Sequence, residues 1–527
     1  MKKINSYYWN LYKESPIGKS VISDFKQLLY EDLSSEELFE MVKKYDEEYF
    51  VNAEDNYLED LIEEVSREFE INNTLLSSAE SIEDYEKIVC DIFDYIANQI
   101  KRYQRWVTQP YREAIKFIIP VSICLHRLYP NFFIPYIFVL KFECLQWIFD
   151  EYGIVINDMP SKFKYKERCH YYFEICEALY NFFEDNKSLN LKPEEKDAFL
   201  YGLSYEVSKS DLTNFPNATP RVWFIGGYYK TDEKQEGRIQ WECNAQIRKG
   251  DILLFYETSL SKEPTHRSKL TSIWRADSDG IVDPFFYYYE IAYIDKKIEV
   301  PFVSLEKLCN HPIVGNIGIV RKKFNGVCGY EVKASEYKAI LELISQADPS
   351  YDMGTLPVLP EQTPFKECTI NVEADVENYY ILEMLKRMGL GEESDSNKKF
   401  LRQVPLQLGR VKKEAGGKTD FSLFPFGEDK KYADVLIETK HGRRELRNEA
   451  EVKVAFKQAE SYAAHQYAGL LMLIDENKIR LYTRNSKDGV FEYTPNPKVF
   501  KWTELDNEDT FQELQNIIYS YNIHKTH

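Results

Sequence analysis

Three patterns of hydrophobic and polar positions follow one another along the chain. Up to about residue 205, apolar positions recur at helical spacing behind capping residues, for example at residues 34–42, 55–70 and 81–103. Between residues 221 and 308, short apolar runs alternate with turn residues, which is typical of a small β-barrel. A helix, a β-hairpin, a second helix and further strands are expected from residue 373 onward. The predicted fold class is therefore multidomain α+β.

These patterns divide the chain into four parts. We expect an α-helical domain at residues 1–205 and a β-barrel at residues 215–347 that ends in a helix at residues 335–347. Residues 348–366 form a linker, and residues 367–527 form an α/β domain. Four prolines and a glycine within residues 348–364 predict a semi-extended spacer between the barrel and the last domain.

The most apolar stretch, residues 117–149, raises the question of a membrane span. Charged residues and prolines interrupt it at residues 126–127, 130–131 and 141–143, so a buried pair of helices is the expected structure. No apolar run follows the first lysines, which predicts that the chain has no secretory signal. Nine scattered cysteines without a Cys-x-x-Cys pair argue against a disulfide framework and a zinc site, and indicate a reducing cytoplasm.

Residues 420–440 carry the clearest chemistry. Two apolar arms, residues 420–426 and 432–440, flank a Gly-Glu-Asp-Lys-Lys loop, which predicts a β-hairpin. Side chains alternate along a strand, so Glu438 and Lys440 point the same way. If Asp420 lies beside them across the hairpin, two carboxylates can bind Mg²⁺ or Mn²⁺ while the lysine orients the attacking water. The alternative is an ordinary hairpin with a surface ion pair.

The hairpin and its flanks resemble the PD-(D/E)XK nucleases, in particular the N-terminal nuclease domain of type I restriction R subunits. The resemblance covers about 120 residues. It implies that Asp420 and Glu438 bind the metal and that Lys440 positions the nucleophile. It also implies that a glutamate of the opening helix, best matched by Glu377, contributes to the metal site.

A helix after the hairpin extends the resemblance. Gln458 and Tyr462 lie four residues apart on one helix face, as in the Gln-x-x-x-Tyr helix of that family, which implies a catalytic role for Gln458. The usual proline before the first aspartate is replaced by Thr419. Asp434 shares the face of Glu438 and Lys440, so either Asp420 or Asp434 completes the metal site.

The formal net charge of −19 is unusual for a protein that handles nucleic acid. Phosphate contacts depend on local charge, however, and residues 408–460 contain 12 Lys and Arg against 10 Asp and Glu. The candidate phosphate contacts in this region, which a solvated charged loop would equally explain, are Lys412, Lys413, Lys418, Arg443, Arg444 and Arg447.

The barrel resembles the EVE domain of the PUA-like superfamily, with a Trp-containing first strand, a Lys-Gly-Asp turn before an apolar strand, and a later strand leading into an Asp-rich loop. The resemblance implies an aromatic pocket for a flipped, modified base. The candidate pocket residues are Trp223, Trp241, Tyr256 and Trp274, each of which could instead be a core aromatic.

Together these features predict a Mg²⁺-dependent DNA endonuclease of restriction or anti-phage type, directed to modified bases. One active site cuts one strand, so double-strand cleavage predicts a homodimer or higher oligomer, or two successive nicks. Partner subunits are a further expectation, and a membrane partner is not expected. The chain contains no Gly-x-x-x-x-Gly-Lys-Ser/Thr phosphate loop, which argues against a translocating motor. The alternatives are a catalytically degenerate sensor subunit of a defence complex, or an RNA nuclease.

Overall fold

The computed structural model describes most of the chain. The exceptions are residues 1, 32, 46–78, 80, 139–141, 158, 162, 213–217, 229–236, 286–289, 361–363, 366–369, 392–398, 407–416, 428–429, 485–488 and 523–527. The helix expected at residues 55–70 and the candidate phosphate contacts Lys412 and Lys413 lie outside the described residues.

The chain forms two compact units. The first contains residues 1–213 and a short segment, residues 281–290, that comes from within the barrel sequence. Residues 214–280 and 291–526 form the second unit, so the barrel and the C-terminal α/β region belong to one body. The inserted segment packs into the first unit through Phe285, whose ring meets Tyr136 edge-on, and through the Pro284 carbonyl, which accepts a 3.3 Å hydrogen bond from Arg168.

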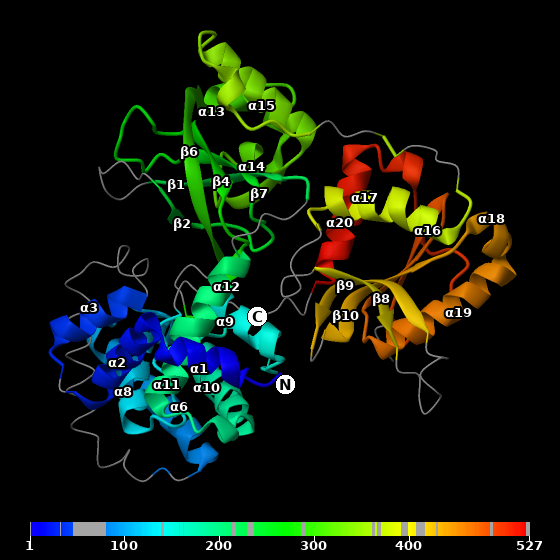
Figure 1. Ribbon diagram of the computed structural model, residues 1–527. Coiled ribbons are helices and arrows are strands. Elements are labelled where there is room, and N and C mark those ends of the chain that lie inside the picture. Colours follow the sequence, from blue (N-terminus) through cyan, green and yellow to red (C-terminus); the bar gives the residue numbers. More distant parts are fainter. Residues whose placement is uncertain are drawn as a thin grey trace. The chain divides into compact units, whose positions relative to one another are not determined.

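The first unit is helical, as the sequence predicts. Its main helices are α1 (Ser6–Glu14), α2 (Pro16–Tyr30), α3 (Ser35–Tyr45), α6 (Ile82–Tyr103), α7 (Pro110–Ala114), α8 (Ile118–Leu128), α9 (Phe142–Tyr152), α10 (Tyr165–Asp185), α11 (Pro193–Ala198) and α12 (Tyr205–Leu212) (Figure 1). Ser81 and Asp84 form the capping box that starts α6, because each side chain accepts a hydrogen bond from the backbone N–H of the other residue.

The apolar stretch at residues 117–149 is buried inside this unit. Helices α8 and α9 flank an extended segment whose side chains, from Phe132 to Phe138, are all buried. Both ring nitrogens of His126 in α8 lie close to an oxygen atom. Nε2 is 2.8 Å from the Asp197 carboxylate, and Nδ1 is 2.7 Å from the Phe133 carbonyl oxygen. Across the ranges that the structure describes, no helix is long and apolar enough to cross a membrane.

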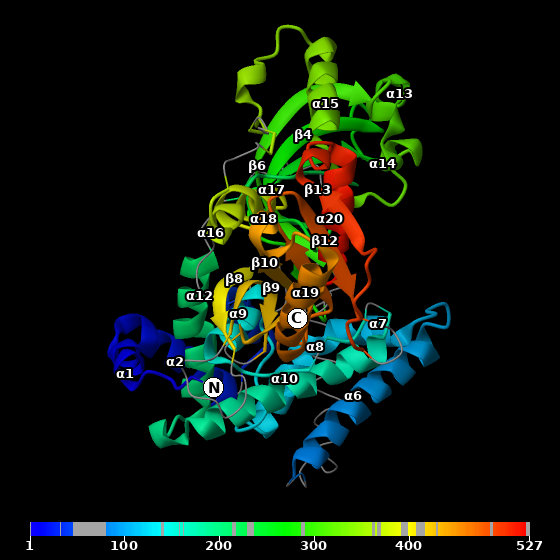
Figure 2. The ribbon, with the colours of Figure 1, turned by 90° about the vertical axis from the view of Figure 1, so that its right-hand side faces the viewer.

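The second unit contains two sheets. The first has the strand order β2-β6-β4-β3-β1-β7, with β1 (Val222–Gly227) parallel to β3 (Ile252–Glu257) and the other pairs antiparallel. The other strands in this order are β2 (Ile239–Glu242), β4 (Lys269–Ala276), β6 (Glu290–Ser304) and β7 (Cys328–Val332). Figure 2 shows the curvature of β4 and β6 beside α15 (Ala334–Ala347).

This sheet is an open half-barrel rather than the closed barrel that the sequence pattern indicated. Just beyond the edge strand β2, Asn244 donates a 3.4 Å hydrogen bond to the Gly329 carbonyl of the other edge strand, β7. Gly329 has a φ of +89°, and a Cβ there would lie 2.5 Å from the Asn244 nitrogen, so this contact requires glycine. One face packs on α13 (Leu305–Asn310), α14 (Gly318–Arg321) and α15, and the other lines the inside of the curve.

The second sheet is the middle layer of an α/β/α sandwich. Its order is β13-β12-β11-β10-β9-β8, in which only β10 (Tyr432–Thr439) and β11 (Leu470–Ile474) are parallel. The other strands are β8 (Phe400–Pro405), β9 (Lys418–Phe426), β12 (Lys478–Thr483) and β13 (Lys498–Lys501). Helix α19 (Glu449–His465) connects the parallel pair, as such a crossover requires, and covers one face.

The opposite face of this sheet carries the opening and closing helices of the region. The opening helix runs through α16 (Glu373–Val376), a π-helical turn (Glu377–Ile381) and α17 (Leu382–Arg387), and it packs beside α20 (Glu508–Ser520). Figure 1 shows these helices and α19 on opposite sides of the strands. The helix, hairpin, helix and strand order of the sequence prediction is present.

The proline-rich spacer is largely exposed but is anchored at two buried residues. Leu356 is buried in the half-barrel core and Phe365 in the core of the second sheet. The Tyr337 hydroxyl donates a 2.6 Å hydrogen bond to the Pro357 carbonyl. These contacts hold the described part of the spacer against both sheets.

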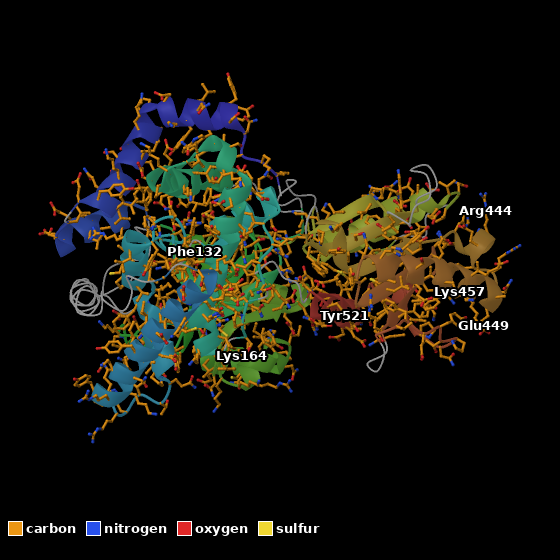
Figure 3. All side chains as sticks on the ribbon, turned by 90° about the horizontal axis from the view of Figure 1, so that it is seen from below. Phe132, Lys164, Arg444, Glu449, Lys457 and Tyr521 are labelled. Atoms are coloured by element: carbon orange, nitrogen blue, oxygen red, sulfur yellow. The ribbon has the colours of Figure 1, made fainter. Side chains whose placement is uncertain are left out.

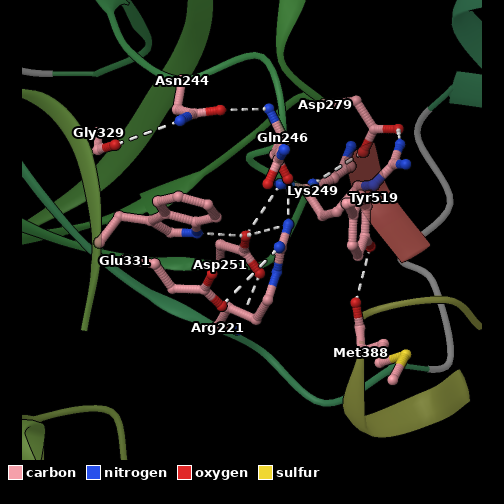
Figure 4. Close-up of polar contacts among 12 residues, drawn as sticks. Arg221, Asn244, Gln246, Lys249, Asp251, Asp279, Gly329, Glu331, Met388 and Tyr519 are labelled. Carbon is pink, nitrogen blue, oxygen red and sulfur yellow. Dashed lines mark hydrogen bonds and ion pairs between the residues drawn. The ribbon is translucent and has the colours of Figure 1, made fainter. Parts of the chain in front are cut away.

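A buried arginine joins the half-barrel to the C-terminal helices. The Arg221 guanidinium lies 4.7 Å from the Trp223 ring centre and 5.4 Å from that of Tyr519 in α20, as Figure 4 shows. Asp251 and Glu331 approach it at 3.7 and 3.9 Å. Arg221 is almost inaccessible to solvent, and its neighbours come from both halves of the unit. This seam explains why the two regions form one body.

The Tyr519 hydroxyl at this seam provides a test of its strength. It donates a 2.7 Å hydrogen bond to the carbonyl of Met388, the C-cap of α17. Tyr519→Phe is expected to destabilise the end of α17 by about 1 kcal/mol, because a buried carbonyl loses its partner. Hydrogen exchange over residues 382–390 should therefore accelerate. Tyr521→Phe is the control, since that hydroxyl has no partner among the described residues, and equal effects of both changes would contradict this role.

Candidate active site

The β9–β10 hairpin brings Asp420 and Glu438 to the same end of the second sheet. The antiparallel register pairs Leu436 with Ser422 and Ile437 with Phe421, so the next pair along the ladder is Glu438 with Asp420. The Thr439 backbone N–H donates a 2.6 Å hydrogen bond to Asp420 Oδ2. Local strand pairing therefore fixes the first carboxylate beside the Glu-x-Lys segment.

Lys440 is bound within this group of oxygens. Its Nζ donates to Glu438 Oε1 at 2.7 Å, to the Thr439 carbonyl at 2.9 Å and to Glu373 Oε1 at 3.1 Å. Glu438 is 2% exposed and Lys440 is 8% exposed, which excludes the surface ion pair considered from the sequence. A buried pair that shares its lysine with a third carboxylate is costly to assemble.

The electrostatics of the group follow from burial and crowding. Burial raises the pKa of Glu438 above its ordinary value, and the charge of Asp420 acts in the same direction against the lowering effect of Lys440. Burial also raises the pKa of Asp420 and of Glu373. Burial alone would lower the pKa of Lys440, but Glu438 and Glu373 outweigh it and hold that pKa above its usual range. The two neighbouring carboxylates thus favour the protonated form of Lys440.

The structure places two glutamates of the opening helix near the site. Glu377, the residue matched from the sequence, is buried and forms a 2.8 Å ion pair with Arg402 Nη2. Its charge is one cause of the raised pKa of Asp420. Glu373, one helical turn earlier, contacts Lys440 and was not identified from the sequence. The four-residue spacing to Glu377 was the available signal.

The geometry favours Asp420 over Asp434 as the first carboxylate. Asp434 lies on β10 itself, four residues before Glu438, and a strand rises about 3.3 Å per residue. The two Cα atoms are thus about 13 Å apart along the strand. Asp434 is buried beneath the segment that leads into β11, where its carbonyl accepts the Gly469 N–H at 2.8 Å. The Asp420 side chain, in contrast, accepts the Thr439 N–H at 2.6 Å, beside Glu438.

Gln458 and Tyr462 lie on α19, on the other side of the sheet from the opening helix. The exposed Gln458 amide donates a 3.1 Å hydrogen bond to the Tyr462 hydroxyl. A Cβ on Gly417, just before β9, would lie 2.4 Å from that hydroxyl, so the pair sits against the start of the strand that carries Asp420. Among the described residues, Gln458 makes no hydrogen bond to Asp420, Glu438 or Lys440.

The two carboxylates provide the kind of ligand atoms that a divalent cation prefers. The donor set is oxygen only, as Mg²⁺ and Mn²⁺ prefer, and Glu438 Oε2 is buried without a hydrogen-bond partner. A cation held by Asp420 and Glu438 would satisfy that oxygen. Within the described ranges, no three Asp, Glu, His or Cys side chains form a group that could hold a metal ion, and the expected third ligand Glu377 is instead paired with Arg402.

The candidate phosphate contacts differ in their exposure to solvent and in their ion pairs. Lys418, Arg443 and Arg444 are exposed, and Figure 3 shows Arg444 near the outer edge of the second unit. Arg447 is engaged by Glu451, with Nη2 2.6 Å from the carboxylate. The backbone N–H groups of Gly442 and Arg443 both donate to the buried Glu476, which secures the turn that follows Lys440.

The four aromatic residues proposed for a base pocket do not line one surface. Trp223, Trp241 and Trp274 face the inside of the half-barrel, whereas Tyr256 faces the opposite side and stacks on Phe324 at 3.7 Å. Successive side chains of β3 alternate between the two faces, which corrects the prediction of a shared pocket.

Burial further separates the three tryptophans. Trp223 and Trp274 are 2% and 0% exposed, and their ring N–H groups are bound to Asp251 at 2.7 Å and Ser272 at 3.0 Å. Trp241 is only partly buried; its ring N–H donates a 3.2 Å hydrogen bond to the Gly226 carbonyl, and its ring stands edge-on to Phe255. Trp241 is thus the aromatic that a ligand could reach.

Comparisons with protein-family models, with curated proteins and with solved structures give no match. The arrangement of the residues around Lys440 is therefore the basis for a functional interpretation.

Proposed function

We propose that the chain is a metal-dependent phosphodiesterase that cuts DNA at the site formed by Asp420, Glu438 and Lys440. The observation that supports this most strongly is the buried lysine bound to Glu438 at 2.7 Å, beside a second carboxylate fixed by strand pairing. Desolvated charges of both signs at a strand end are costly, and such groups are concentrated at binding and catalytic sites. The bare carboxylate oxygen of Glu438 supports a cation site at the same point.

The residues of the site have separable roles in this proposal. Asp420 and Glu438 hold Mg²⁺ or Mn²⁺, which when bound supplies a polarised phosphate and an activated water. The Lys440 ammonium stabilises the negative charge that develops on the scissile phosphate. Glu373 holds Lys440 in place, and the exposed Arg443 and Arg444 bind flanking phosphates. Gln458 acts through Tyr462 on the start of β9.

We expect a change at Glu373 to affect the position of Lys440 but not the binding of the metal. Glu373→Gln is expected to lower the cleavage rate about tenfold, because Lys440 loses one of its two carboxylate partners and its orientation. The apparent affinity for Mn²⁺ should change little. Glu383→Gln, in the same helical run but paired with Arg387, is the matched control. A loss of Mn²⁺ affinity equal to the loss of rate would make Glu373 a metal ligand instead.

We further propose a restriction or anti-phage role in which the half-barrel directs the cutting to modified bases. The curved sheet with Trp241 on its inner face supports this role. The test compares cleavage of methylated, hydroxymethylated and unmodified plasmid in Mg²⁺. Preferential cutting of one modified substrate is expected, and loss of that preference in Trp241→Ala would assign the reading to this face. Cleavage that is indifferent to modification would contradict it.

Double-strand cleavage by this site requires two copies of the chain or two successive nicks. An RNA substrate remains the alternative for the same chemistry, and a parallel assay on RNA of equal sequence separates the two, because 2′-hydroxyl recognition would favour RNA. One observation favours a binding subunit without catalysis: the Lys440 ammonium already neutralises Glu438. Calorimetry that detects no Mn²⁺ binding to the intact chain would support that alternative.

A further inference from the structure

A buried carboxylate orients a histidine at one rim of the half-barrel. Glu257 ends β3 and its side chain is 3% exposed. One of its oxygens accepts a 2.7 Å hydrogen bond from Ser261 Oγ, and the other lies 2.8 Å from His266 Nδ1. The ring of His266 is partly exposed, and its Nε2 has no partner among the described residues. Glu257 therefore fixes the orientation of the ring through Nδ1 and leaves Nε2 for a ligand.

An arginine beside this histidine is anchored in a similar way. Arg267 Nε donates a 2.7 Å hydrogen bond to the Ser261 carbonyl oxygen, while the side chain is exposed. Within the part of the chain that the structure describes, its terminal nitrogens form no ion pair, although its charge acts on the nearby exposed Glu263. Most surface arginines lose rotamer freedom when they bind a phosphate, but an internal hydrogen bond has already restricted this one.

An exposed aromatic ring adjoins these donors. Phe302 of β6 is 39% exposed, and His266 stands edge-on to it with ring centres 4.7 Å apart. Lys269 Nζ lies 5.5 Å from the centre of the same ring. The Leu305 N–H donates a 3.0 Å hydrogen bond to the Ser268 carbonyl, which fixes the β3–β4 loop against the end of β6. The exposed ring of Phe302 therefore lies next to two side chains that can carry positive charge.

The charge of this loop differs from that of the chain. Lys262, Arg267 and Lys269 carry three positive charges, against one exposed carboxylate, Glu263, and the buried Glu257. The helical region, residues 1–205, contains 37 Asp and Glu against 23 Lys and Arg. A local basic surface next to an aromatic ring is the combination that binds single-stranded nucleic acid.

We propose that the rim formed by residues 258–269 and Phe302 is a binding site for single-stranded nucleic acid. Arg267 and His266 bind a backbone phosphate, and one base stacks on Phe302. This site is separate from Asp420, Glu438 and Lys440, and from the inner face that carries Trp241. A strand displaced when duplex is opened is the form of nucleic acid that it would hold.

Fluorescence anisotropy of the full-length chain with a labelled single-stranded oligonucleotide tests the site. The buffer contains EDTA, so binding does not depend on cleavage or on the proposed nuclease site. Phe302→Ala is expected to weaken binding about tenfold through loss of one stacked base. Arg267→Ala should weaken binding to all sequences alike and reduce the slope of log affinity against log salt by about 1.

Lys338→Ala, an exposed lysine on α15, is the control and should leave the affinity and the salt slope unchanged. Ser261→Ala should weaken binding modestly, because Glu257 and His266 lose an orienting contact without any change of charge. Unchanged affinity in both Phe302→Ala and Arg267→Ala would overturn the proposal, as would an equal effect of Lys338→Ala. A preference for duplex DNA that persists in Phe302→Ala would also overturn it.

Discussion

Lys440→Ala is expected to reduce DNA cleavage by about a thousandfold while the chain remains folded. Two effects act together. The scissile phosphate loses a cation that the site holds in place with hydrogen bonds of 2.7 to 3.1 Å. In addition, Lys440 no longer opposes the effect of burial on the pKa of Glu438, so this carboxyl is protonated more readily and becomes a weaker metal ligand.

Lys501→Ala on β13 is the control, because that lysine is exposed and forms a surface ion pair with Glu504. Lys440→Arg is informative as well, since it keeps the charge but changes its shape and hydrogen-bonding directions. Circular dichroism and hydrogen exchange of β10 establish that the variants are folded. Undiminished cleavage by folded Lys440→Ala would remove the nuclease assignment.

Asp420→Asn is expected to abolish Mn²⁺ binding in calorimetry at concentrations that saturate the unmodified chain, and to reduce cleavage about a thousandfold. An amide keeps the size of the side chain but removes one of two anionic ligands, and hard cations depend strongly on ligand charge. The bond from the Thr439 N–H to this side chain can still form through the amide oxygen. The fold should therefore survive the change.

Asp434→Asn distinguishes the two aspartates that the sequence left as alternatives. Its Cα lies about 13 Å from that of Glu438 along β10, so it should retain both Mn²⁺ binding and cleavage. The reverse result, with Asp434→Asn inactive and Asp420→Asn active, would contradict the assignment of the site from strand register.

Much of the local structure could be predicted from the sequence because short-range signals determine it. The capping box at Ser81 marks the start of α6, and the apolar arms around residues 427–431 mark the hairpin. The two-residue spacing of Glu438 and Lys440 placed both on one face, and the structure shows them in contact. The mixed α/β character of the C-terminal region followed from the order of its helices and strands.

Long-range contacts explain what the sequence did not reveal. Glu373 contacts Lys440 across 67 positions of the chain, and no local pattern distinguishes it from Glu377. Arg221 reaches Tyr519 over almost 300 positions, so the junction of half-barrel and C-terminal helices was read as a linker. Tyr256 and Trp223 lie on opposite faces of the sheet. Which face a side chain takes depends on the register of its strand, and the presence of aromatic residues in a sequence does not reveal that register.

The most direct test of the proposed site is cleavage of supercoiled plasmid, carrying the preferred base modification if one is found, by the intact chain and by Lys440→Ala purified in parallel. With Mg²⁺ or Mn²⁺, the intact chain should convert the plasmid to nicked and linear forms, whereas EDTA and Lys440→Ala should each leave it supercoiled. Metal-dependent conversion at equal rates by both proteins, or no conversion of any plasmid by the metal-loaded intact chain, would contradict the proposal.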